Sequence, residues 1–242
     1  MFGLKKNSNI LKVSVVDEIK TKDITPEEIK TSVVSQKEST PKVLTEEEKI
    51  KIKAEYNRLM DRYVPPHNIK SKKVTAVDIP TILTDGADLI AMCQLPRGHY
   101  KGILALAHSQ INDKNPLRFF VLPSGFIIIN PFIINHTQTP VFKEEGCMSY
   151  PDDQMKEMLP RYHKITVKYQ TLIKKDEEKE PSLGPFTTDK LSGKMANIFQ
   201  HETTHLNGYN IYDENFDPQW SIGFGDGLPV SPEIGEDIII SK

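Results

Sequence analysis

Two histidines four residues apart, His201 and His205, constrain this chain more than any other feature of its sequence. They belong to the run QHETTH at residues 200–205, in which Glu202 follows the first histidine. Residues four apart lie on one face of an α-helix, so the two imidazoles can bind one metal ion together. Glu202 then lies beside that ion, where its carboxylate can take a proton from a bound water. A helix surface with two solvated histidines is the plain alternative, because short motifs also arise by chance.

A metal ion held by two histidines needs a third protein ligand and an open position for water. The chain has two cysteines, Cys93 and Cys147. Cys93 ends an apolar run that is spaced like the inside of a helix, which is typical of a small core residue. Cys147 lies among acids, glycine and serine, and Gly146 lets the backbone approach an ion closely. Cys147 is therefore the cysteine that does not fit a buried core.

Two longer motifs around these residues resemble a known family. Residues 145–149, EGCMS, are similar to the EGCLS motif of peptide deformylases, and residues 200–208, QHETTHLNG, resemble their QHExDHLNG motif. Asp213 matches an aspartate that commonly follows. Residues 159–169 resemble the family's arginine-led strand, and residues 126–131 resemble a strand that ends in an Asn-Pro turn. The resemblance runs from about Val74 to Asp213, in the family's order.

The resemblance implies a single metal site. Cys147, His201 and His205 would hold one divalent ion, with Fe(II) favoured and Zn(II), Ni(II) or Co(II) able to occupy the site. Ligand chemistry alone does not separate these metals.

The implied reaction removes the formyl group from the N-terminal formylmethionine of nascent proteins and yields formate. Glu202 would act as general base and then pass its proton to the departing amine. Gln110 and the backbone N–H of Met148 would stabilise the formyl oxyanion. Gly146 fits a close approach between chain and substrate. The partners implied are N-formylmethionyl peptides.

The third family motif, GxGLAAxQ, is where this chain departs. The matching residues 103–110 read ILALAHSQ, so Ile103 and Ala105 replace both glycines and His108 replaces the second alanine. This segment lines the substrate cleft in the family, which makes these three residues candidate substrate contacts. His108 is either an additional polar group in the cleft or a plug. Thr204 is a second departure, because an aspartate normally precedes the second metal histidine in the family. The loss of that carboxylate is expected to loosen the support of the site without abolishing metal binding.

The overall composition indicates a protein without nucleic-acid or membrane partners. The formal net charge is −2 over 242 residues, which leaves no electrostatic footprint for nucleic acid or anionic lipid. No apolar run approaches membrane-spanning length, and the start lacks the apolar segment of a signal peptide. Two cysteines make no disulfide framework. We therefore expect a reducing, cytoplasmic location, or membership of a large protein assembly.

The chain divides into three parts by composition. Residues 1–66 are expected to form a polar, partly helical N-terminal extension, residues 67–215 the catalytic domain, and residues 216–242 a Gly/Pro-containing tail. Trp220 and Phe224 are candidate anchors of this tail on the domain. Thr45 opens a helix that runs towards Tyr63. Its apolar stripe packs either on the catalytic domain or on a protein partner, and the first is the commoner case.

Hydrophobic periodicity predicts an α+β fold with antiparallel strands wrapped around one metal-binding HExxH helix. Helices are expected at residues 78–93, with Gly86 as a weak point, and at residues 191–206. Strands are expected at residues 119–122, 126–129, 141–142 and 165–169. The charged run 174–180 is expected to be a solvated turn. The family's fold agrees with this pattern.

Three functions compete. The leading hypothesis is an active peptide deformylase. The second is another metal hydrolase, such as an HExxH endopeptidase, which needs Asp213 or Glu214 as its third ligand. The third is a structural or interaction protein that retains a deformylase-like domain in an assembly, and the polar leader, the unusual tail and the altered segment 103–110 favour it somewhat.

Overall fold

The structure is a computed structural model that describes residues 45–63, 69–94, 103–147, 157–174, 180–212 and 216–222, without the side chains of residues 48, 49 and 157. None of the helices in these ranges is long and apolar enough to cross a membrane. The expectations for residues 1–44 and 223–242, including Phe224, lie outside the described residues.

A five-stranded sheet is the framework of the described chain. Its strands follow the order β1-β2-β3-β6-β9, and all neighbours are antiparallel. These strands are β1 (Leu106–Ala107), β2 (Phe119–Val121), β3 (Ile127–His136), β6 (Lys164–Gln170) and β9 (Thr187–Ser192). Two antiparallel ribbons complete the strands: β4 (Pro140–Glu145) pairs with β5 (Glu157–Tyr162), and β7 (Leu172–Ile173) pairs with β8 (Ser182–Leu183).

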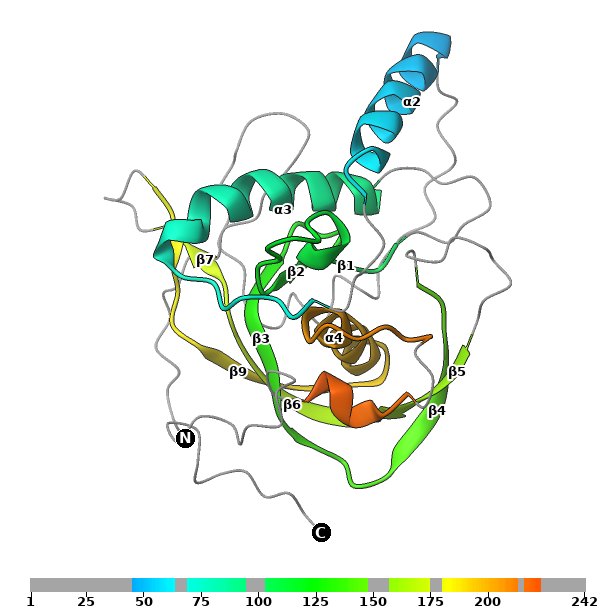
Figure 1. Ribbon diagram of the computed structural model, residues 1–242, viewed down its shortest axis with the longest axis vertical. Helices are drawn as coiled ribbons and strands as arrows, with labels where there is room; N and C mark the ends of the chain where they lie inside the picture. Colours follow the sequence, from blue (N-terminus) through cyan, green and yellow to red (C-terminus); the bar gives the residue numbers. More distant parts are fainter. Residues whose placement is uncertain are drawn as a thin grey trace, which may run out of the picture.

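Three α-helices and three 3-10 turns accompany these strands in the described ranges. They are α2 (Glu46–Met60), η1 (Ala76–Asp78), α3 (Ile79–Gln94), η2 (His108–Gln110), α4 (Gly193–Leu206) and η3 (Pro218–Ser221). Figure 1 shows α4 in the middle, with β3, β6 and β9 curving around one side and the β4-β5 ribbon on the other. The helix α3 crosses above them, and α2 projects from α3. This arrangement confirms the predicted α+β fold around the HExxH helix.

Alternation along β2 and β3 divides the core into two layers. Phe120 and Ile128 face α4 and pack with its residues Ala196 and Phe199. Their neighbours along the strands, Phe119, Ile127 and Ile129, face α3 instead. They pack in a second cluster with the α3 residues Ile82 and Leu89. Because successive strand side chains point to opposite faces, this part of the sheet is buried between α3 and α4. The strand β1 and the residues 108–110 that follow it, which precede β2 in the chain, contact both helices.

Gly86 lets α3 approach the sheet closely. A Cβ at this position would lie 2.9 Å from Cδ1 of Ile127, so even an alanine would displace that side chain. The glycine that weakens the predicted helix therefore contributes close packing in the folded chain.

The strand β3 differs from its prediction at Asn130 and Pro131. It does not end there but continues to His136, with a shift of register against β6 between Ile129 and Phe132. Asn130 adopts a φ of 49°, and its side-chain amide bonds both backbone groups of Val74. Asparagine tolerates this left-handed conformation, and proline is acceptable at a bulge because its missing N–H breaks no ladder bond.

The helix predictions need small corrections. The metal-binding helix begins at Gly193, because Leu191 and Ser192 belong to β9, where Leu191 pairs with Ile165. Propensity alone does not separate these residues from a helix start. The charged run predicted as a turn lies mostly outside the described residues. Sequence patterns also missed the short strands β1, β7 and β8 and the polar strand β9, which has no apolar alternation strong enough to indicate a strand.

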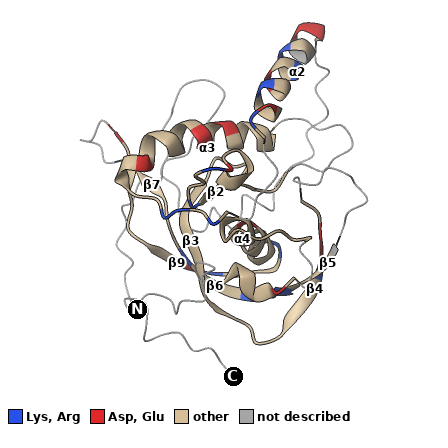
Figure 2. Cartoon of the chain, viewed as in Figure 1, with Lys and Arg blue, Asp and Glu red and all other residues tan. Residues whose placement is uncertain are grey.

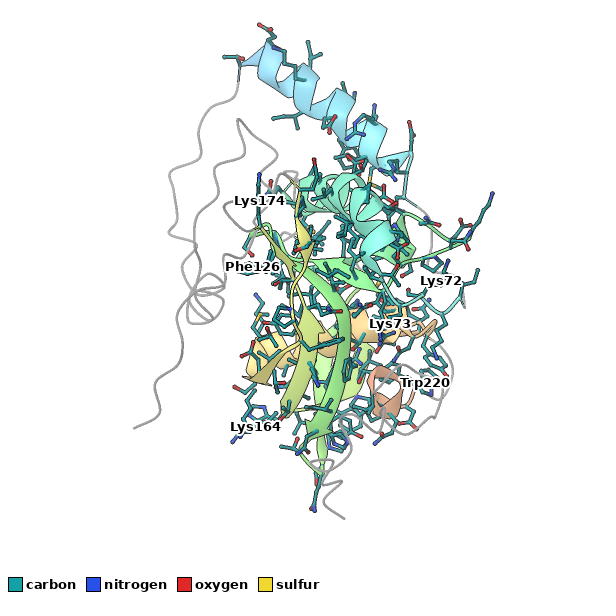
Figure 3. The ribbon with its side chains drawn as sticks, turned by 90° about the vertical axis from the view of Figure 1, so that its left-hand side faces the viewer. Lys72, Lys73, Phe126, Lys164, Lys174 and Trp220 are labelled. Atoms are coloured by element: carbon teal, nitrogen blue, oxygen red, sulfur yellow. The ribbon has the colours of Figure 1, made fainter. Side chains whose placement is uncertain are left out.

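The two ends of the described chain pack on this framework. Leu59 of α2 is fully buried among α3 residues such as Ile82 and Leu89, so the apolar stripe of α2 contacts the domain at its C-terminal end. At the other end, Trp220 lies in η3 (Figure 3) and stacks on Tyr209, which follows α4, at 4.5 Å between ring centroids.

Candidate metal centre

Cys147, His201 and His205 come together, although the cysteine lies 54 positions before the first histidine. The Cys147 Sγ lies 3.2 Å from Nε2 of His205, which is 3.2 Å from Nε2 of His201. All three potential ligand atoms lie within 4.8 Å of one another. Cys147 follows β4 and both histidines project from the same face of α4, so the ribbon and the helix build the cluster together.

The outer nitrogen of each histidine ring is held by another group. Nδ1 of His201 lies 2.9 Å from a carboxylate oxygen of Glu145, and Nδ1 of His205 lies 3.3 Å from the carbonyl oxygen of Tyr209. A proton on each Nδ1 satisfies these acceptors and leaves each Nε2 lone pair available to bind a cation. This arrangement is typical of histidines that bind a metal ion.

Glu145 is itself fixed by Arg161 of β5. The guanidinium donates to both carboxylate oxygens at 2.7 and 2.8 Å, and both side chains are buried. Burial alone raises the pKa of Glu145, but the hydrogen bonds from Arg161 and His201 outweigh it and lower the pKa to about 2. Glu145 is thus ionised and holds His201 in one orientation.

Thr204 occupies the position of the missing aspartate. Its hydroxyl accepts a hydrogen bond from Nη1 of Arg161 at 3.2 Å and donates to the carbonyl of Gln200 at 2.8 Å. The ring of Phe216 lies 4.7 Å from the Arg161 guanidinium carbon. Arg161 therefore has a partner at Thr204 although the carboxylate is lost.

The donor set suits a cation. Burial raises the pKa of the Cys147 thiol, but the nearby imidazoles of His205 and His201 lower it well below its ordinary value. The thiolate is the form of cysteine that binds metals. One soft thiolate and two imidazoles match the ligands of Zn(II), Fe(II) and related ions.

Glu202 supplies the most telling feature of the cluster. Its side chain is nearly enclosed, with 4% of the residue exposed, and its Oε2 has no hydrogen-bond partner among the described residues. Burial raises its pKa, although the neighbouring imidazoles of His201 and His205 counteract this effect. A buried carboxylate oxygen without a protein partner is costly unless another group, such as a metal-bound water, occupies the space beside it.

Gln110 lies at the end of η2, a turn that contacts α4. The residue is 2% exposed, and its carbonyl Oε1 accepts a hydrogen bond from the Ala107 N–H at 2.8 Å. This bond fixes the orientation of the side-chain amide.

The other predicted site residues occupy different surroundings. Ala105 belongs to the core layer on α4, whereas Ile103 packs at the edge of the layer on α3. Gly146 is exposed, and a Cβ there would meet nothing within 4 Å. Met148 lies outside the described residues, as do Asp213 and Glu214, the alternative third ligands.

His108 lies inside the protein, away from solvent. Its ring is fully buried, stacks on Phe119, and lies 2.9 Å from Asp85 of α3 through Nε2. Its Nδ1 accepts a hydrogen bond from the Leu117 N–H. Both ring nitrogens are therefore engaged inside the protein.

Three contacts of the centre were missing from the predicted site: Glu145, Arg161 and the carbonyl of Tyr209. The signal for Glu145 was its place two residues before Cys147, which puts both side chains on one side of an extended chain. Nothing local in the sequence indicates that Arg161 pairs with it, because that contact arises only when β5 pairs with β4.

Cys147, the two histidines of the HExxH helix and Glu202, whose Oε2 has no partner among the described residues, are the residue types of a single-metal hydrolase site. The polypeptide deformylase family model matches residues 90–219, which is more than half of the chain. The chain therefore belongs to the polypeptide deformylase family.

The chain is also similar to individual peptide deformylases. The chain is 34% identical over 118 residues to a peptide deformylase of Thermotoga neapolitana, an alignment that covers 48% of this chain and 63% of that protein. The chain thus spans less than two thirds of the length of this relative. The chain is also similar to the crystal structure of the Thermotoga maritima peptide deformylase, with 29% identity and a TM-score of 0.47. This alignment covers 62% of this chain and 94% of that protein.

Proposed function

We propose that this protein is a peptide deformylase, a metal-dependent hydrolase that removes the formyl group from the N-terminal formylmethionine of nascent proteins. The observation that carries the proposal is the convergence of three potential ligands beside Glu202, whose buried Oε2 has no partner among the described residues. Membership of the polypeptide deformylase family supports the same reaction.

Cys147, His201 and His205 are the residues that would hold the metal ion, and Glu145, Arg161 and the Tyr209 carbonyl would fix the two imidazoles. When bound, a divalent cation polarises the formyl carbonyl and lowers the pKa of water. We favour Fe(II), as the family resemblance implies, with Zn(II), Ni(II) or Co(II) as substitutes. The thiolate keeps the donor set selective for such ions over Mg(II) or Ca(II).

The chain's own groups move the protons. Glu202 accepts a proton from the attacking water, and burial, which raises its pKa, makes it a better base for this task. Water oxygen bonds to the formyl carbon, and the carbon–nitrogen bond then breaks as Glu202 passes the proton to the departing amine. The products are formate and a free amino terminus.

Charge on the formyl oxygen needs donors fixed in advance. We assign this role to the side-chain amide of Gln110, which Ala107 orients, and to the backbone N–H of Met148. Ile103, Ala105 and Gly146 would border the substrate, and the open space above Gly146 suits close approach of a peptide. His108 acts in another way, because both of its ring nitrogens are already engaged.

The test is formate release from formyl-Met-Ala-Ser by protein loaded anaerobically with Fe(II) or Ni(II). The Glu202→Gln variant should lose at least about a hundredfold in kcat while it retains its metal, because only the base is removed. The matched control is Glu47→Gln, the same change at an exposed site of α2, and it should leave turnover unchanged.

Two outcomes would contradict the proposal. Wild-type turnover that persists in Glu202→Gln would show that another group acts as the base. Cleavage of internal peptide bonds of an N-terminally blocked peptide, without formate release, would indicate the endopeptidase alternative.

A further inference from the structure

We propose that His108 and Asp85 are positioning residues for Gln110, and that Arg62, just beyond α2, completes the same device. The inference rests on the proposed role of Gln110 in binding the formyl oxygen. It explains why residues 103–110 carry a histidine where the family motif has an alanine.

The geometry fixes the histidine ring and its proton. The Leu117 N–H donates to Nδ1 of His108 at 2.7 Å, so the ring's proton lies on Nε2. Nε2 then donates to Oδ2 of Asp85 at 2.9 Å. The ring also stacks on Phe119, with centroids 4.6 Å apart and planes inclined by 20°. Three contacts from two segments, α3 and the chain that enters β2, thus hold this fully buried ring.

Gln110 shares one short turn with His108. Both residues belong to η2, in which the His108 carbonyl accepts hydrogen bonds from the N–H groups of Ile111 and Asn112. The Gln110 side chain closes back on the Ala107 N–H, and the turn contacts both α3 and α4. A movement of Gln110 relative to the metal helix would therefore have to break the bonds that hold His108.

The N-terminal helix reaches this turn through Asp85. Arg62, in the turn that ends α2, donates to Oδ1 of Asp85 at 2.8 Å and also pairs with Asp88. Asp85 thus gives one carboxylate oxygen to Arg62 and the other to His108. Figure 2 shows the acidic residues on α3 where α2 approaches it. The extension before the deformylase motifs is in this way connected to the proposed oxyanion donor.

The connection compensates for the lost glycines. Among the described residues other than glycine, Asn130 alone has a positive φ, so Ile103 and Ala105 adopt ordinary backbone conformations. The segment is then positioned by side-chain contacts, of which the buried His108–Asp85 bond is the most specific.

Kinetics separate positioning from mere stability. In His108→Ala, Asp85→Asn and Arg62→Met, we expect kcat to fall between about tenfold and a hundredfold at a temperature where each variant is folded, with KM and bound metal changed less than about twofold. The control is Arg58→Ala, which removes a neighbouring arginine that bonds Asp88 and Glu55 but not Asp85. Its kcat should match the wild type.

A conservative variant tests the mechanism directly. His108→Gln retains an amide donor that reaches the place of Nε2, so it should recover more of kcat than His108→Asn, which can only replace Nδ1. Equal loss in both variants, or a loss of kcat that follows the loss of metal, would overturn the positioning role.

Hydrogen exchange tests the device without any substrate. The Ala107 amide reports whether the Gln110 side chain stays closed on η2. It should lose protection in Arg62→Met and not in Arg58→Ala. Unchanged protection in Arg62→Met would remove Arg62 from the device, and unchanged protection in His108→Ala would refute it altogether. A wild-type protein that releases no formate but shows the Ala107 response would refute the proposed function alone.

Discussion

The two sides of the candidate site are built differently. On the metal side, Cys147, His201 and His205 lie in two contiguous motifs, and Glu145, within the first motif, contacts His201 directly. On the other side, Gln110 lies in a segment whose motif is altered, and its turn is held by contacts to α3 and, through Asp85, to the end of α2. The metal side therefore depends on ligand chemistry that tolerates little change, whereas the Gln110 side depends on packing that another set of side chains can supply.

The departures from the family pattern teach the same lesson. Thr204 replaces the family's aspartate but still forms a hydrogen bond with Arg161. The loss of the carboxylate therefore leaves Arg161 with a partner at this position. His108 replaces a small residue and creates a new hydrogen-bonded connection across the core. The substitution at Thr204, beside the Glu145–Arg161 ion pair, leaves that pair intact. The substitution at His108, inside η2, adds hydrogen bonds that hold the turn itself.

The largest expected effect would come from Glu145→Gln. The change removes the charge that pairs with buried Arg161 and holds His201, so metal affinity should fall between about tenfold and a hundredfold. The free energy of unfolding should fall by about 3–5 kcal/mol, because the buried guanidinium loses its counter-charge. Metal titration and urea unfolding measure the two effects. Glu144→Gln, the same change at the exposed neighbour, is the matched control, and an equal effect there would contradict the assignment.

An acid-dependent effect should distinguish the Gln110 side. Burial raises the pKa of Asp85, but the contacts with His108 and Arg62 outweigh it, so the folded-state pKa lies below the ordinary 3.8. A depressed pKa stabilises the fold above the unfolded-state pKa, and this contribution is lost as the pH falls through the folded-state value. Wild type and Asp85→Asn should therefore differ in unfolding free energy at about pH 6 and converge as the pH falls below the ordinary pKa of Asp85. A constant difference would mean that the Asp85 charge contributes nothing.

The smallest effect is expected at Thr204. Thr204→Val removes the hydrogen bond from Arg161 and the hydrogen bond to the Gln200 carbonyl, while Arg161 keeps both of its bonds to Glu145. The unfolding free energy should therefore fall by about 1–2 kcal/mol. Metal binding should be unchanged within about twofold. If metal affinity fell as far as in Glu145→Gln, the threonine would have replaced the function of the lost aspartate rather than only its contact.

Several elements were predictable because their signals are local. The HExxH helix and the long apolar strands follow from periodicity and residue type, and the α+β fold follows from their order. The expectation that Cys147 does not fit a buried core was wrong, because its side chain packs in a buried cluster with Leu159 and Ile211. The polar strand β9 and the continuation of β3 beyond Pro131 were not predictable in this way. Both depend on pairing with β6, a partner distant in the sequence.

The amino-acid sequence by itself indicated the candidate ligands, the spacing of the two histidines on α4 and the family to which the chain is similar, because a helix converts a spacing of four into a shared face. Tertiary structure decided which outer groups hold those ligands and how Gln110 is placed. Arg161 meets Glu145, and Arg62 meets Asp85, only after separate elements have packed. The physical reason is that a buried charge needs a partner of opposite charge, and the fold decides which distant residue supplies it.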